Sequence, residues 1–207
     1  YFTESTKVVA VDEEFEMQLN SVYYDSYWNI VDAPQATAPV GVYDANGVYS
    51  VPDVLKGENL FGSYFSKAAT DFNGKAKMRF TAAGTYTLTA QYDSANFTDY
   101  NYSTPQYYLV PPICTVTVVD TTDADSVLSG AEALLTWQTV NSAEPAYALT
   151  NNFALPATLD VLGENVTISW SAAPSGDALS VSSDYNYAYV TRPLADDESY
   201  TLTATLS

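Results

Sequence analysis

The residue types that usually carry enzyme chemistry are scarce in this 207-residue chain. There is no histidine, which excludes Ser-His-Asp and Cys-His nucleophilic sites, HExxH metalloprotease sites and histidine metal sites. Neither a P-loop nor a GxGxxG sequence is present. The single cysteine, Cys114, alternates with valines in "ICTVTVV", which is typical of a small buried strand residue and not of a reactive thiol. We therefore expect no enzyme activity and no cofactor.

Carboxylates are abundant. The chain contains 25 Asp and Glu residues and only 7 Lys and Arg residues, which gives a net charge of −18. A carboxylate pair can serve a glycosidase, but the runs Asp12–Glu14 and Asp196–Glu198 lie in turn-like sequence, where solvated charge is the ordinary role. Asp120, Asp123 and Asp125 offer hard oxygen ligands for calcium, or they cap a helix and compensate its dipole. The sequence favours capping, since no complete EF-hand or RTX pattern is present. We predict no catalytic and no metal-binding residues.

The most unusual stretch is "YDSANFTDYNYSTPQYYLVPP", which runs from Tyr92 to Pro112 between two predicted strands. Long connections in compact domains tend to be either functional or disordered. Its Tyr, Asn and Asp content is typical of sugar- and protein-binding loops, and an acidic chain favours neutral or cationic ligands. The alternative is an ordered loop whose rings cover the edge of the core. The candidate ligand-binding residues are Tyr100, Tyr102, Tyr107 and Tyr108.

Most of the remaining sequence alternates with a period of two between turn residues, as in "KVVAV" from Lys7 to Val11, and predicts strands. Lys7 itself could form a Lys–Asn isopeptide cross-link. The Asp-x-Asn-Gly sequences that end at Gly47 and Gly74 predict tight turns with positive φ angles. One segment predicts a helix, with Thr122 or Asp123 as its N-cap. The apolar face of this helix consists of Val127, Leu128, Ala131, Leu134 and Leu135.

The phrase "YTLTA" occurs twice, at 86–90 and at 200–204. In an immunoglobulin-like sandwich a tyrosine near the start of the penultimate strand bonds through its hydroxyl to the backbone, and alternate residues after it face the core. Tyr86 and Tyr200 fit this corner, while leucine stands where antibody domains have cysteine. Trp170 in "TISW" fits the buried tryptophan that packs against that point. The repeat therefore predicts one sandwich per copy.

Two stretches also resemble known families. The elements "ALTNNFALP", "NVTISWSAAP", "VTRP" and "YTLTATLS", within residues 123–207, resemble the atrophied bacterial Ig domain in type and order. The stretch "SSDYNYAYVTRP" departs from that pattern, which has a short Asp-Gly turn before "VTRP". The segment "TDFNGKAKMRFTAAGTYTLTAQY", within residues 70–119, is similar to the general bacterial Ig-like pattern. The resemblance implies a spacer or interaction module without catalytic residues, of the kind found in large cell-surface and secreted proteins.

We expect an all-β chain of two tandem immunoglobulin-like β-sandwich domains, residues 1–120 and 121–207, with one short helix at the start of the second. Both ends look cut, which predicts a fragment of a larger protein. The expected function is a non-catalytic extracellular structural or adhesive module of a larger bacterial cell-surface or secreted protein. The lack of an internal disulfide is compatible with this location, because secreted proteins of many Gram-positive bacteria carry none, and we expect a Gram-positive source. The alternative is a carbohydrate-binding module that accompanies a carbohydrate-active enzyme.

The tyrosine-rich loop and the acidic charge of the chain also indicate which partners to expect. A glycan or a host or cell-surface protein fits the tyrosine-rich loop, whereas nucleic acid does not fit so acidic a chain. No apolar run approaches 18 residues, so we expect no membrane insertion in this segment. We expect a monomer.

Overall fold

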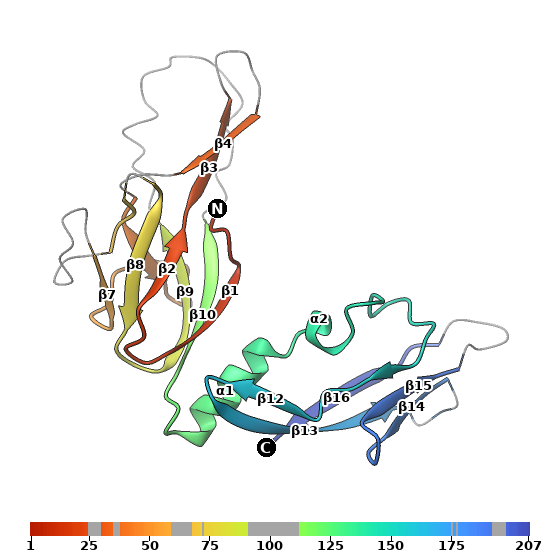
Figure 1. Ribbon diagram of the computed structural model, residues 1–207. Helices are drawn as coiled ribbons and strands as arrows, with labels where there is room; N and C mark the ends of the chain where they lie inside the picture. The colour runs from red at the N-terminus through yellow and green to blue at the C-terminus, as the bar shows by residue number, and fades with distance from the viewer. Residues whose placement is uncertain are drawn as a thin grey trace. The chain divides into compact units, whose positions relative to one another are not determined.

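The computed structural model describes residues 1–24, 30–34, 38–58, 68–71, 73–90, 112–174, 176, 178–191 and 198–207. The described residues form sixteen strands and two short helices, which confirms the all-β class (Figure 1). The chain divides into two compact units, residues 1–120 and 121–207. Each unit has its own sheets.

The first unit contains two facing sheets and a separate two-stranded ribbon (Figure 1). The larger sheet has the order β1 (Thr6–Ala10), β10 (Ile113–Val119), β9 (Gly84–Ala90), β5 (Val40–Tyr43) and β6 (Tyr49–Ser50). The smaller sheet has the order β2 (Phe15–Gln18), β8 (Lys75–Phe80) and β7 (Leu55–Gly57), and the ribbon pairs β3 (Asn20–Tyr24) with β4 (Ile30–Pro34). All neighbours are antiparallel except β1 and β10, which run parallel.

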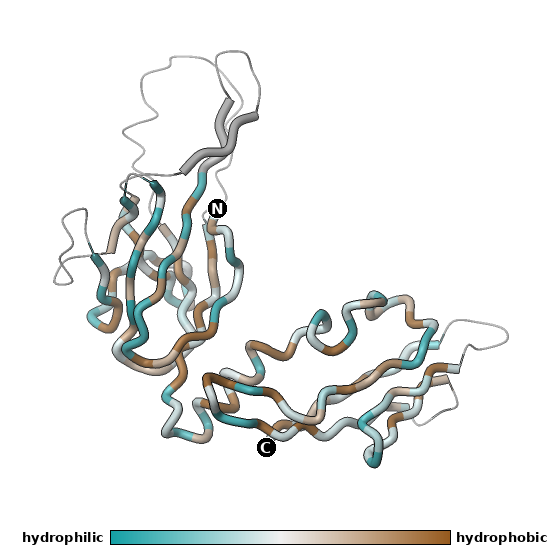
Figure 2. Tube along the Cα trace, in the orientation of Figure 1, coloured by the Kyte–Doolittle hydropathy of each residue, from teal (hydrophilic) through white to brown (hydrophobic). Residues whose placement is uncertain are grey.

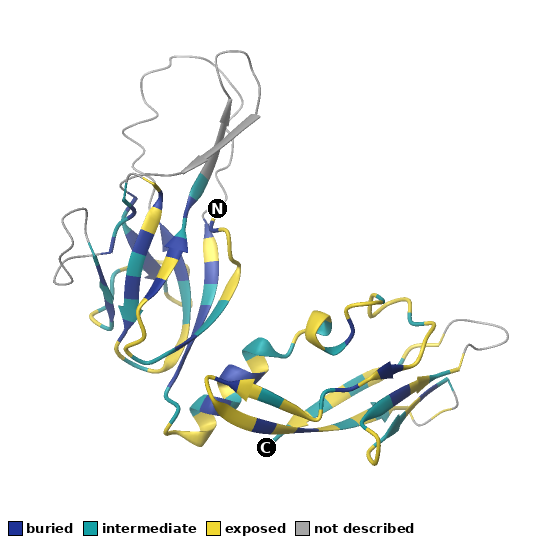
Figure 3. Ribbon diagram, viewed as in Figure 1, coloured by how far each residue is buried: buried dark blue, intermediate teal, exposed yellow. Residues whose placement is uncertain are grey.

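The core of the first unit lies between these two sheets, because alternate residues of each strand point inward. On β8, Ala76, Met78 and Phe80 are fully buried, while the lysines and the arginine between them turn outward. Leu88 of β9 and Val116 of β10 complete the same apolar cluster from the other sheet. Figure 2 shows the alternation of hydropathy along the strands, and Figure 3 shows the matching alternation of buried and less buried positions. The two sheets therefore form a β-sandwich.

The first copy of the repeated phrase forms the predicted corner. The Tyr86 hydroxyl donates to the carbonyl oxygen of Ala82 at 3.1 Å, four residues upstream. Its ring stacks on Phe80, with ring centroids 4.2 Å apart and an interplanar angle of 13°. The next inward residues, Leu88 and Ala90, are buried as predicted. The hydrogen bond and the stacking together tie the turn before β9 to the core.

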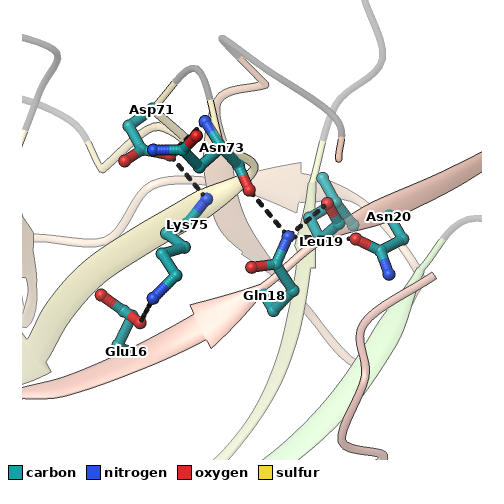
Figure 4. A network of polar contacts seen from close by, with 7 residues as sticks. All are labelled: Glu16, Gln18, Leu19, Asn20, Asp71, Asn73 and Lys75. Atoms are coloured by element: carbon teal, nitrogen blue, oxygen red, sulfur yellow. Dashed lines mark hydrogen bonds and ion pairs between the residues drawn. The ribbon is translucent and has the colours of Figure 1, made fainter. Parts of the chain in front are cut away.

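The two Asp-x-Asn-Gly turns have the same local structure. In each, the aspartate Oδ1 accepts from the backbone N–H groups two and four residues later, at 2.8 to 2.9 Å. The glycines have φ angles of 75° at Gly47 and 73° at Gly74, as the Asn-Gly sequences predicted. At the second turn, Gln18 Nε2 also donates to the carbonyl oxygen of Asn73 at 2.8 Å, which ties the end of β2 to the turn before β8 (Figure 4).

The second unit pairs its strands in two three-stranded sheets (Figure 1). One has the order β12 (Thr158–Val161), β13 (Glu164–Ala173) and β16 (Thr201–Leu206), and the other has the order β11 (Phe153–Ala154), β15 (Tyr187–Val190) and β14 (Leu179–Ser182). The buried residues Phe153, Leu179 and Ala188 of the second sheet pack against Trp170 and Leu202 of the first. Trp170, which the sequence predicted to be buried, is half-buried and packs against this cluster, and its Nε1 donates to the carbonyl oxygen of Pro156 at 2.8 Å.

Helix α1 (Ala124–Leu134) precedes these sheets, and the short helix α2 (Trp137–Val140) comes after it. Of the two predicted N-caps, Asp123 is the one used, because its carboxylate accepts from the backbone N–H of Ser126 at 3.0 Å. The predicted apolar face is turned inward to different degrees, with Val127 and Ala131 buried and its three leucines half-buried. This face packs α1 against β12 and β13.

Candidate functional site

The four tyrosines that the sequence singled out for ligand binding, Tyr100, Tyr102, Tyr107 and Tyr108, lie outside the described residues. Their role therefore stays a prediction. Cys114 is described and is fully buried in β10, as its valine-rich context predicted. Burial raises the pKa of its thiol from 9.0 to about 11, so the reactive thiolate is almost absent at neutral pH.

The acidic turn between β1 and β2 takes part in surface ion pairs. Glu14 lies 3.0 Å from Lys77 and Asp12 lies 3.9 Å from Arg79, and these cations stand on the outer face of β8. Lys7, the candidate for a covalent cross-link, forms an ion pair with Glu4 at 2.7 Å. Within the described part of the chain, no three acidic, cysteine or histidine side chains gather closely enough to hold a metal ion. The carboxylates of Glu4, Asp12 and Glu14 thus pair with the lysine and arginine side chains of the surface.

A hollow of about 420 Å³ opens in the second unit, between the loop after α2 and the strands β14 and β15. Its walls include Tyr147, Leu149, Leu179, Val190, Glu198 and Tyr200. Glu198 supplies the one carboxylate among the described lining residues, and its Oε2 accepts from the Tyr200 hydroxyl at 2.6 Å; Asp196 and Asp197, next to it in the chain, lie outside the described residues. A pocket with this lining can hold a small neutral or cationic group.

The loop that forms one wall of this hollow is held in place by Glu144. Its carboxylate accepts hydrogen bonds from the hydroxyl and the backbone N–H of Thr150, and from the backbone N–H and the side-chain amide of Asn151, at 2.5 to 3.1 Å. These hydrogen bonds lower the pKa of the Glu144 carboxyl to about 2, and the bond from the Thr150 hydroxyl makes the largest contribution. The carbonyl oxygen of Glu144 accepts from Trp137 Nε1 at 2.7 Å, which anchors the loop to α2. These bonds hold the loop after α2 in one conformation, so this wall of the hollow is formed before any ligand binds.

Tyr200 opens the second copy of the repeated phrase and lines the same hollow. Its hydroxyl donates to Oε2 of Glu198 at 2.6 Å, and the residue four positions upstream, which corresponds to Ala82 at the first copy, lies outside the described residues. Gly176 lies against the Tyr200 side chain, since a Cβ atom at position 176 would be 2.5 Å from the Tyr200 hydroxyl oxygen. The second tyrosine corner therefore stays a prediction.

A second feature that the sequence did not single out as a site is the outer face of the sheet β11, β15 and β14. Tyr187 and Tyr189 stand on this face in tilted contact, with ring centroids 5.2 Å apart. Tyr185, in the turn before them, is 76% exposed. The signal was present in the alternating tyrosines of "SSDYNYAYVTRP", but only the burial of Ala188 and Leu179 on the opposite face shows which way they point.

Among the described residues, neither helix has the length and apolar character needed to cross a bilayer. No family model, no curated protein and no solved structure matches this chain. The function of the chain is therefore inferred from its residues and from the geometry of its two units.

Proposed function

We propose that the chain is a non-catalytic extracellular module of a larger bacterial surface or secreted protein, built from two immunoglobulin-like sandwiches. The first unit acts as a mechanical spacer and the second as the site of interaction. The resemblance of both halves to bacterial Ig-like domains points in the same direction. One observation carries the spacer role, namely the parallel pairing of β1 with β10.

The strand order of the first unit supports an immunoglobulin-like interpretation. In that fold, strands B, E and D form part of one sheet and strands G, F and C the other. The orders β2-β8-β7 and β10-β9-β5 correspond to these triplets, and the Tyr86 corner opens the strand that corresponds to F. In the second unit, Trp170 and Leu202 share one apolar cluster, as the corresponding residues of such a sandwich do.

The parallel pair determines how the first unit resists tension. Thr6 lies beside Thr115 and Ala10 beside Val119, so the chain enters the pair at one end and leaves it at the other. Tension applied at the two ends of this unit slides β1 and β10 past each other. All the hydrogen bonds between them are then loaded at once, whereas peeling the strands apart would load them one at a time. Shear of this kind requires a larger force, which suits a spacer.

The second unit is arranged differently. Its first residues, Thr121 and Thr122, and its last, Ser207, line one small hollow beside the start of β13. The two ends of this unit therefore lie close together, and tension between them would unzip β16 from β13, starting where Leu206 pairs with Ile168. While folded, this unit adds little to the length of the chain, and its terminal strands are not loaded in shear, which favours an interaction role over a spacer role.

Single-molecule force spectroscopy on the full chain tests the spacer role through the direction of pulling. Handles at residues 1 and 120 load β1 and β10 in shear, whereas handles at residues 12 and 120 peel β1 from the Val119 end. We expect a several-fold higher unfolding force in the first geometry. Equal forces in the two geometries would refute the proposal.

Proline substitutions provide a second, matched test. The Thr115 N–H donates to the carbonyl oxygen of Ser5, and the Val11 N–H donates to that of Val119, both at 2.9 Å. Odd-numbered residues of β1 therefore face β10 with their backbone groups, and even-numbered ones face away. Lys7→Pro removes one bond of the ladder and should lower the shear force, while Thr6→Pro, one residue earlier, should leave it nearly unchanged.

A further inference from the structure

The outer face of the sheet β11, β15 and β14 combines aromatic rings with small polar neighbours. Across β15 and β14, Tyr187 lies opposite Ser182 and Tyr189 opposite Ser180. On the other side, Ala154 of β11 lies opposite Tyr187. Serine and alanine are too short to cover a tyrosine ring, so both rings rise above their neighbours and their sides remain accessible.

The strand that carries Tyr187 and Tyr189 is fixed by the core on its opposite face. The residues between them, such as Ala188, and those of the neighbouring strand, such as Leu179, point to the opposite face and belong to the apolar core. Asn152 accepts from the backbone N–H of Val190 at 2.7 Å through its side-chain oxygen, which fixes the end of β15. The two tyrosines thus stand on a rigid strand, which limits the entropy lost when a ligand binds.

The electrostatics of the unit restrict the ligand. Residues 121–207 contain eleven acidic residues and a single basic one, Arg192. An anionic ligand would be repelled by this field, and the described neighbours of the two rings include no cation that could pair with it. The described cross-strand neighbours of the two tyrosines are serine and alanine, which carry no charge. A neutral ligand with apolar faces and many hydroxyls fits these properties.

We propose that Tyr187 and Tyr189, with Ser180 and Ser182, form a binding platform for a neutral polysaccharide chain. The apolar C–H faces of the sugars stack on the tyrosine rings, and the serine and tyrosine hydroxyls bond to sugar hydroxyls. The two ring centroids lie 5.2 Å apart along the strand, so the platform can contact neighbouring sugars of an extended chain. A protein partner fits less well, because protein interfaces favour a contiguous apolar centre, and here polar serines interrupt the aromatic surface.

The proposal is independent of the spacer role of the first unit, and its test does not involve force. The full chain is run in affinity gels that contain arabinoxylan, mixed-linkage β-glucan, galactomannan or dextran, with polygalacturonate as the anionic counterpart. A polysaccharide that retards the chain is then measured by titration calorimetry, together with its oligosaccharides of increasing length. We expect retardation by at least one neutral polysaccharide, none by polygalacturonate, and affinity that rises from one sugar to several.

Substitutions locate the site. Tyr187→Ala or Tyr189→Ala should each weaken binding about tenfold, as the loss of an aromatic hot spot does, and Tyr189→Phe should retain most of it. The matched control is Tyr147→Ala, which removes a tyrosine that is 91% exposed in the same unit but lines the hollow. Circular dichroism and thermal unfolding check that every variant is folded.

Four outcomes would overturn the proposal. They are retardation by none of the neutral polysaccharides, stronger retardation by polygalacturonate, wild-type affinity in the Tyr187→Ala/Tyr189→Ala double variant, and loss of binding in Tyr147→Ala alone. Binding that survives the double variant but is lost in Tyr100→Ala would place the glycan site in the first unit. None of these results bears on the unfolding forces, so the two proposals fail separately.

Discussion

Removal of the Tyr86 hydroxyl separates the two contributions of the corner in the first unit. Tyr86→Phe deletes the 3.1 Å hydrogen bond to the Ala82 carbonyl oxygen and retains the ring that stacks on Phe80. A net hydrogen bond contributes about 1 kcal/mol, and because Ala82 is partly exposed, water can replace the lost donor. We therefore expect a loss of about 1 kcal/mol in the free energy of unfolding of the first unit. Tyr86→Ala also removes the ring and should cost about 3 kcal/mol.

Hydrogen exchange measured by mass spectrometry in low denaturant resolves this effect, because peptides from β9 and β10 report on the first unit and peptides from β13 and β16 on the second. A loss of about 1 kcal/mol corresponds to roughly fivefold faster exchange in β9 and β10. Exchange in β13 and β16 should not change. Tyr43→Phe is the matched control, since Tyr43 is also half-buried in the first unit, and it should cost less than about 0.5 kcal/mol.

Equal stability of Tyr86→Phe and the wild type would refute the reasoning, since the corner would then contribute only through its ring. A loss as large as that of Tyr86→Ala would refute it in the other direction. In that case the hydroxyl, and not the stacking on Phe80, would hold the turn before β9.

Three further predictions concern other parts of the chain. Trp170→Ala should destabilise the second unit by about 2–3 kcal/mol, which is less than the loss expected for a fully buried tryptophan. Hydrogen exchange of β13 peptides at increasing urea concentration measures this loss. Because the pKa of Glu144 is lowered to about 2, its contribution to loop stability is complete above its ordinary pKa of 4.5 and is lost as the pH falls through about 2. The protection factors of the Thr150 and Asn151 amides, which correct for the intrinsic pH dependence of exchange, should therefore fall only in that acid range, and in Glu144→Gln at neutral pH. The thiol of Cys114, with its pKa raised to about 11, favours the folded state below pH 9.0 and destabilises it progressively as the pH rises toward 11. Cys114→Ala should reduce this alkaline loss, and a thiol reagent should not label the folded wild type at neutral pH.

Local patterns in the sequence determined the elements of this fold. The period-two alternation marked β8, β9 and β10, because one face of each strand must be apolar where it meets a core. The buried side chain of Cys114 and the N-cap at Asp123 followed from their immediate neighbours in the same way. The two Asp-x-Asn-Gly turns were predictable because an aspartate acceptor and a glycine with positive φ act within five residues. The Tyr86 corner was also predictable, since its bond spans only four residues.

Features that join distant segments were decided by the tertiary structure. Nothing in the sequence of β1 distinguishes pairing with β10, more than a hundred residues later, from pairing with β2, because the strand pattern specifies a buried face and not a neighbour. The alternation of Tyr187 and Tyr189 was visible, but which face of β15 they occupy depends on Phe153 and Leu179 packing beneath Ala188. A period-two sequence requires that alternate residues share a face, and only the packing of one sheet on another determines which of the two faces meets solvent.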